Sequence, residues 1–163
     1  MTGSEKPFQG LAFNLSSLGY AVSRGFTHTL APLELHPREF AVLRAVGFEE
    51  GQSQQALGDA LRIPRSRMVA IVDELEARKL LQRRPHPSDR RVRALYLTDA
   101  GQLLLEQAFA EAVAYEQQVG SALSPNERKQ LLALLDRVST SLDLADGAHA
   151  ALREPDTNDD TNA

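Results

Sequence analysis

The sequence contains no cysteine, which excludes disulfide bonds, thiolate metal ligands and cysteine-based redox sensing. Its four histidines are scattered, and none lies at metal-ligand spacing from another, so no metal site is expected. No apolar run approaches the roughly 20 residues that a membrane-spanning helix needs. The first residues, Met1 to Pro7, are polar and include no apolar signal-peptide stretch. We therefore expect a cytoplasmic protein without a membrane partner.

Motifs of catalysis are also missing. The sequence has no glycine-rich phosphate loop, no set of nucleophile, base and acid, and no paired carboxylates in an apolar setting. Its Asp and Glu residues fall on predicted helix faces and near the end of the chain, where solvation explains them. We therefore expect no enzymatic activity, no catalytic residue and no cofactor.

What the sequence does contain is an uneven distribution of charge. The 163 residues are 42% hydrophobic and 25% charged, which is ordinary for a globular protein, and the net charge is −4. The segment from Arg62 to Arg93 nevertheless holds ten Lys and Arg against four Asp and Glu, a local charge of +6, and the remainder carries −10. Such asymmetry indicates an anionic partner that binds at one place.

Apolar residues recur at steps of three and four along most of the chain, which predicts helices. Ser53 is placed to cap one of them, proline occupies the first turn of two others, and Ser124 to Glu127 form a capping box. Turn-forming residues within residues 81–98, flanked by short apolar alternation, predict a β-hairpin. The expected helices span residues 8–31, 37–47, 53–61, 64–80, 98–120 and 124–144.

This order predicts a mainly α fold with a small β-hairpin wing, that is, a winged helix-turn-helix over residues 36–98. Residues 8–35 and 99–145 are expected to form dimerisation helices, because their apolar stripes are too wide for one small lobe. Residues 1–7 and 146–163 have almost nothing apolar to bury and are expected to be disordered.

Four segments carry a resemblance to a known family. Ser53 to Arg67 resembles the helix-turn-helix of the multiple antibiotic resistance regulator (MarR) family, and so does Val72 to Leu81. Arg83 to Arg91 is similar to the wing signature of that family, and Leu97 to Gly101 is typical of it. The similarity is close over about residues 36–110. It implies an obligate homodimer on a pseudo-palindromic DNA operator, commonly a repressor that small aromatic acids or phenolics release.

Two departures from the family pattern stand out. Arg62 occupies a turn position that usually carries glycine, which predicts a strained or differently shaped turn. Val69 and Ala70 stand where the recognition helix often has Thr and Arg, so fewer polar side chains face the bases there.

DNA reading needs donors near the N-terminus of a helix that enters the major groove. Arg65 and Arg67 are the candidates for contacts with guanine, or else with phosphate, and Ser66 for phosphate or base. Ser53 and Gln54, at the start of the preceding helix, are candidates for phosphate contacts, although simple capping would also explain them.

The hairpin is expected to place arginines in the narrow minor groove. Arg90 and Arg91 lie near its tip, and the family motif favours Arg91 as the side chain that inserts. Asp89 is interpreted as a brace that orients an arginine, because a carboxylate is repelled by phosphate. Arg83 and Arg84, on the strand that leads to the tip, are expected to neutralise phosphates.

An effector site is predicted on the first helix. Tyr20, Arg24 and His28 are four residues apart and align on one ridge, with Ser17 one turn earlier, a combination suited to an aromatic carboxylate or phenolic ligand. Arg44 and Phe48 of the second helix are candidates for the same site. A dimer-interface ridge is the alternative for Arg24. For the whole chain, the alternatives are a winged-helix protein-interaction module and a DNA-binding protein without a ligand.

Overall fold

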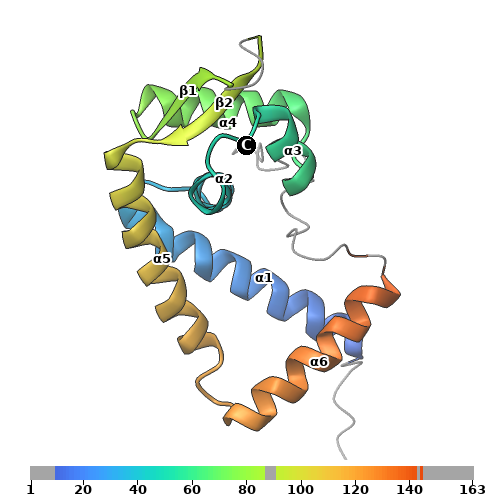
Figure 1. Ribbon diagram of the computed structural model, residues 1–163. Helices are drawn as coiled ribbons and strands as arrows, with labels where there is room; N and C mark the ends of the chain where they lie inside the picture. The colour runs from blue at the N-terminus through green and yellow to red at the C-terminus, as the bar shows by residue number, and fades with distance from the viewer. Residues whose placement is uncertain (1–9, 87–90, 143, 145–163) are drawn as a thin grey trace, which may run out of the picture.

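The computed structural model describes residues 10–86, 91–142 and 144. Figure 1 shows one lobe made of α2, α3, α4 and two strands, with α1, α5 and α6 extending below it. The elements are α1 (Leu11–Leu30), a short 3-10 turn (Ala31–Leu33), α2 (Pro37–Phe48), α3 (Gln54–Leu61), α4 (Arg65–Ala77), β1 (Leu81–Pro85), β2 (Arg93–Leu97), α5 (Asp99–Val119) and α6 (Pro125–Ser141). This is the mainly helical fold with a β-hairpin wing that the sequence predicts.

Side-chain caps fix where three of the helices begin. The hydroxyl oxygens of Ser53, Thr98 and Ser124 accept hydrogen bonds from backbone N–H groups in the first turns of α3, α5 and α6. Each of these bonds satisfies one of the N–H groups that a helix start leaves unpaired. The start of α2 has a capping box that the sequence analysis missed, in which His36 is the N-cap and Glu39 bonds back to the His36 N–H.

The turn between α3 and α4 keeps a left-handed residue without glycine. Arg62 has φ 53° and ψ 34°, and the Ile63 N–H donates to the Gly58 carbonyl at 2.9 Å across it. This is the Schellman arrangement of a helix end. The strain predicted for Arg62 is therefore present, because a side chain with a Cβ is disfavoured at positive φ.

The recognition helix α4 ends at Ala77, three residues earlier than the sequence predicts. Lys79 adopts φ 59°, and the Leu80 N–H donates to the Leu75 carbonyl at 2.9 Å. Both leucines are buried, so an apolar contact closes this second Schellman turn. The chain reverses here and enters β1.

The wing is an antiparallel pair in which Leu81 lies opposite Leu97 and Pro85 opposite Arg93. The segment before α3 pairs with the other edge of β2. There the Gly51 N–H donates to the Leu95 carbonyl at 2.9 Å, and the Leu95 N–H donates to the Gln52 carbonyl at 3.0 Å. The base of the wing is thereby tied to the start of the helix-turn-helix.

The core lies inside the upper lobe and uses the residues that the helical periodicity selects. Met68, Ile71, Val72 and Leu75 of α4 are all buried. They pack with other buried side chains from α2, α3, the strands and the end of α1, among them Leu30, Val42, Leu43, Val46, Leu57, Leu81 and Leu95.

The lower helices leave their apolar faces exposed within the single chain. Over the part of α6 that the structure describes, no residue is buried, and α1 buries only Leu30. Exposed large apolar side chains include Leu11, Phe13, Leu18, Tyr20 and Val22 on α1, Leu103, Phe109, Val113 and Val119 on α5, and Leu131, Leu132, Leu134 and Leu135 on α6. This surface is larger than isolated surface leucines would explain.

Candidate nucleic-acid interface

The first turn of α4 presents polar side chains to solvent from a rigidly anchored helix. Arg65 and Ser66 are exposed and Arg67 is half-buried, whereas the next residue, Met68, is buried in the core. The helix therefore cannot rotate about its axis without exposing Met68. Val69 is partly exposed beside this turn and gives it an apolar component.

The start of α3 lies next to this turn. The Ser53 hydroxyl oxygen accepts a hydrogen bond from the Ala56 N–H at 3.1 Å, so the capping role is confirmed, and its own O–H is free to donate elsewhere. Gln54, Arg65 and Val69 line a small hollow of about 150 Å³ between α3 and α4. The two helix starts thus border one common hollow, which has both polar and apolar walls.

Two arginines of the wing, one on β1 and one shortly before β2, lie at its surface. Arg84 is exposed, and its guanidinium carbon lies 4.8 Å from the centre of the Tyr96 ring, within cation–π range. Arg91 is exposed beyond the end of β1. Asp89 and Arg90 lie outside the described residues.

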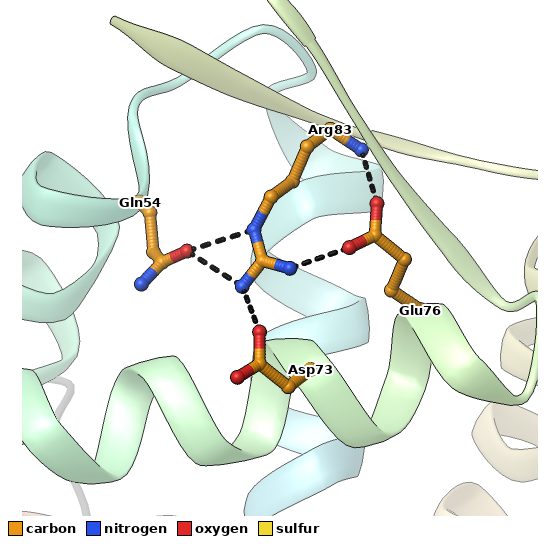
Figure 2. A network of polar contacts seen from close by, with 4 residues as sticks. All are labelled: Gln54, Asp73, Glu76 and Arg83. Carbon is orange, nitrogen blue, oxygen red and sulfur yellow. Dashed lines mark hydrogen bonds and ion pairs between the residues drawn. The ribbon is translucent and has the colours of Figure 1, made fainter.

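The guanidinium of Arg83 is held by several acceptors of the same chain (Figure 2). Nη2 donates to the Asp73 carboxylate at 2.6 Å, and Nε and Nη2 donate to the Gln54 Oε1 at 3.2 and 3.1 Å. Nη1 donates to the Glu76 Oε2, and the Arg83 backbone N–H donates to the other Glu76 oxygen at 3.1 Å. The Arg83 side chain is only 19% exposed. The sequence analysis named neither acid as a partner of an arginine.

A further ion pair connects α2 to the end of α4. The buried carboxylate of Glu39 accepts from Arg78 Nη1 at 3.1 Å and, through its other oxygen, from the His36 N–H at 2.7 Å. Burial, followed by the positive charge of Arg38, lowers the pKa of His36. A neutral His36 suits the cap, because its Nδ1 accepts from the Arg38 N–H at 3.4 Å.

The residues predicted for an effector site divide into two groups. Arg44 and Phe48, near the end of α2, line an open hollow of about 330 Å³ together with Gly47, Leu105, Glu106 and Phe109. Phe48 is 91% exposed and Phe109 53% exposed, so two aromatic rings border this space. The α5 side of the hollow was not predicted, because nothing in the local sequence indicates which face of α5 meets α2.

The other predicted effector residues lie along α1 and do not line that hollow. Ser17, Tyr20, Arg24 and His28 are all exposed in the single chain. Packing of α1 on α5 involves neighbouring positions instead. The Tyr115 hydroxyl donates to the Val22 carbonyl at 2.9 Å, and the Phe26 ring lies between the rings of Phe40 and Tyr115.

The described part of the chain has neither a metal site nor a membrane-spanning helix. It holds no group of three or more His, Cys, Asp or Glu side chains that could bind a metal ion. It likewise holds no helix with the length and apolarity needed to cross a membrane.

Comparison with known proteins agrees with this geometry. Residues 33–92 match the family model described as the MarR family. The HTH-type transcriptional regulator MhqR of Bacillus subtilis (strain 168) is 35% identical over 104 residues, which cover 64% of this chain and 72% of MhqR.

Two solved structures have the same fold. One is the transcriptional repressor CouR bound to a 23-mer DNA duplex, with a TM-score of 0.73 and 31% identity over 85% of this chain and 99% of that one. The other is CouR from Rhodococcus jostii RHA1 bound to p-coumaroyl-CoA, with a TM-score of 0.69 and 28% identity over 83% and 96%. The chain therefore belongs to the MarR family and is a winged helix-turn-helix, DNA-binding transcriptional regulator, not an enzyme.

Proposed function

We propose that this protein is a homodimeric repressor that binds a pseudo-palindromic operator and leaves it when a small aromatic carboxylate or phenolic ligand binds. The observation that carries the proposal is the juxtaposition of the exposed Arg65–Ser66 turn, the capped start of α3 and the basic wing on one lobe with a shared core. A rigid lobe of this kind can place a helix in the major groove and a hairpin in the adjacent minor groove.

Each DNA contact has a role in this proposal. Arg65 and Arg67 reach base edges or the flanking phosphates, and Ser66 supports them from the same turn. Ser53 and Gln54 meet phosphate at the start of α3, where the helix dipole favours an anion. On the wing, Arg84 neutralises phosphate and Arg91 enters the minor groove, with Arg90 beside it and Asp89 orienting it. The repressor CouR, solved on a DNA duplex, supports this arrangement as a relative of the same fold.

The exposed apolar faces of α1, α5 and α6 support the homodimer. A second copy that contributes the same three faces would bury them about a two-fold axis, and a two-fold protein suits a two-fold operator. Removal of apolar surface from water is the main favourable contribution to association of this kind.

The hollow between α2 and α5 supports the ligand response. Phe48 and Phe109 offer ring faces, Arg44 offers a guanidinium for a carboxylate, and Glu106 offers an acceptor for a phenolic O–H. The structure of CouR with p-coumaroyl-CoA, whose acyl group is a phenol, supports this ligand class in a relative. The Tyr20–Arg24–His28 ridge of α1 completes the site in the dimer or, alternatively, forms part of the dimer interface.

Fluorescence anisotropy tests the proposal directly. The full-length protein is titrated onto DNA from upstream of its own gene and onto random DNA of equal length, at two salt concentrations, with and without a panel of aromatic carboxylates and phenols. We expect tight, salt-sensitive and sequence-selective binding that one of the ligands reverses. Arg44→Ala should abolish the response and leave DNA affinity unchanged.

The alternatives give different results in the same assay. Selective binding that no ligand reverses would identify a DNA-binding protein without a ligand of this class. Absence of DNA affinity would contradict the operator proposal and favour a winged-helix module that binds protein. For the ridge on α1, Arg24→Ala should abolish the response with the dimer mass intact; loss of the dimer instead would assign Arg24 to the interface.

A further inference from the structure

The Arg83 network joins three elements of the DNA-reading lobe through one guanidinium. Arg83 comes from β1 of the wing, Gln54 from the first turn of α3, and Asp73 and Glu76 from α4 (Figure 2). The planar guanidinium has five donors in a fixed fork, so it can hold acceptors on several sides at once. In this structure the acceptors come from α3 and α4, and the guanidinium joins both helices to β1.

We propose that Arg83 is a positioning residue that fixes the wing and the Gln54 amide relative to the recognition helix, and that it is not a phosphate contact. The proposal rests on the operator-binding function proposed above. It also replaces the expectation from sequence that Arg83, like Arg84, neutralises phosphates.

The electrostatics of the network support this reassignment. Two carboxylates, those of Asp73 and Glu76, contact the one guanidinium, so its positive charge is compensated inside the chain. The side chain is also 19% exposed, whereas a phosphate-binding arginine needs its donors free in solution. Transfer of Arg83 to a phosphate would leave both carboxylates unpaired beside the DNA backbone, where like charges repel.

The geometry also shows what the network positions. Glu76 uses one oxygen for the Arg83 guanidinium and the other for the Arg83 backbone N–H, which lies on the edge of β1 that faces away from β2. This two-point contact fixes the strand as well as the side chain. β1 therefore has a defined direction relative to α4, as minor-groove insertion by Arg91 requires.

The same contact fixes the orientation of the Gln54 side-chain amide. Its amide oxygen accepts two hydrogen bonds from Arg83, and its nitrogen points away from the guanidinium (Figure 2). The two amide donors are thereby directed away from the guanidinium at the start of α3. With Arg83 absent, the amide could turn its oxygen outward, and an acceptor facing phosphate would repel it.

Charge and geometry make opposite predictions for Glu76→Gln. If charge alone matters, loss of an acid near DNA should strengthen binding to every duplex. If the network positions the wing, the variant should lose affinity for a selected operator, by about tenfold or about 1.4 kcal/mol, and keep or gain affinity for random DNA. Glu74→Gln is the matched control, because Glu74 has the same charge, lies on the same helix and is exposed.

Arg83→Lys provides the second test. Lysine keeps the positive charge but cannot hold the acceptors in a fixed fork, and it serves well as a phosphate contact. Positioning therefore predicts an operator loss of about tenfold with unchanged affinity for random DNA. A phosphate contact predicts near-native binding to both. The double variant with Glu76→Gln should lose no more than Arg83→Lys alone, since both changes break one network.

The measurement is fluorescence anisotropy on a duplex that the native protein enriches from a randomised pool and on a random duplex of equal length. Affinities are compared at a temperature at which thermal unfolding shows every variant to be folded. A fall in the ratio of operator to random affinity for Glu76→Gln and Arg83→Lys, with no fall for Glu74→Gln, supports the proposal. Equal or stronger operator binding by either variant overturns it.

Hydrogen exchange of the protein without DNA separates this proposal from the operator proposal. Both variants should speed amide exchange in β1 and β2 and leave the centre of α2 unchanged. If the native protein enriched no duplex, operator binding would fail as a function, and the exchange rates alone would decide whether Arg83 braces the wing. Unchanged exchange in β1 and β2 would overturn the brace.

Discussion

Replacement of Gly101 by alanine should destabilise the protein through a single atom. A Cβ at Gly101 would lie 1.9 Å from the Leu80 carbonyl oxygen, whereas real Cβ contacts stay above 3.0 Å, so one backbone segment must move by about 1.1 Å. Neither segment can move freely. Leu80 is buried at the end of α4, and Gly101 lies in the first turn of α5.

The contacts that would be lost set the magnitude. The Leu80 carbonyl accepts from the Thr98 N–H at 3.1 Å, and the Thr98 hydroxyl donates to the neighbouring Lys79 carbonyl at 2.6 Å and caps Gly101 at 3.0 Å. At about 1 kcal/mol for each hydrogen bond or cap, their loss amounts to about 3 kcal/mol. For a chain of this length that lowers Tm by roughly 6–12 °C.

Thermal unfolding at a fixed protein concentration measures this effect, because the Tm of the proposed dimer would depend on concentration. Ala100→Gly is the matched control: it exchanges the same two residue types at the adjacent exposed position and should cost at most about 1 kcal/mol. A Tm of Gly101→Ala within the range of that control would refute the argument that the Leu80 carbonyl blocks this site.

Four further changes test other parts of the structure. Arg62→Gly should raise the unfolding free energy by up to about 1 kcal/mol, since glycine removes the positive-φ strain; a lower Tm would contradict that strain. Because the pKa of His36 is lowered on folding, its contribution to stability is intact above about pH 6.5 and declines as the pH falls through the folded value. His36→Asn, which keeps a capping acceptor, should therefore reduce the difference between the Tm at about pH 7.5 and the Tm at about pH 5.5. An unchanged difference would assign the pH dependence to other groups. Arg91→Ala should weaken operator binding and flatten its salt dependence, and an unchanged slope would remove the wing from the interface. Arg67→Ala should cost roughly 1–3 kcal/mol and relax one base preference, whereas a uniform loss over all sequences would make Arg67 a phosphate contact.

The elements of the fold could be predicted because their signals are local. The spacing of Met68, Ile71, Val72 and Leu75 selects one face of a helix, and that face is the one buried. The predicted cap at Ser53 is also present, since a capping hydroxyl needs only the next few residues of its own chain. The end of α4 was missed, because nothing in the lysine side chain indicates that Lys79 will adopt a left-handed conformation.

The site was harder to predict because its partners are distant in sequence. Arg83 reads as one more basic residue in a basic segment, and only the packing of β1 on α4 brings it to Asp73 and Glu76. In the same way, Arg44 and Phe48 could be recognised as candidates on α2, but the α5 residues opposite them could not. The residue types therefore predicted a DNA-binding surface, whereas the surroundings of each arginine depend on tertiary contacts.

The two strands of the wing are held by different parts of the lobe, and this difference indicates where a ligand can act. Arg83 ties β1 to α4, whereas β2 is tied to the segment that follows Phe48. In that segment Glu50 Oε1 accepts from the Leu97 N–H at 3.0 Å, and the Gly51 N–H donates to the Leu95 carbonyl. A ligand that displaces Phe48 would thus act on the segment between α2 and α3. This segment is hydrogen-bonded to β2 and leads into Gln54. The exposed ridge of α1 makes no hydrogen bond to either strand among the described residues, so the hollow between α2 and α5 is the better-placed part of the proposed effector site.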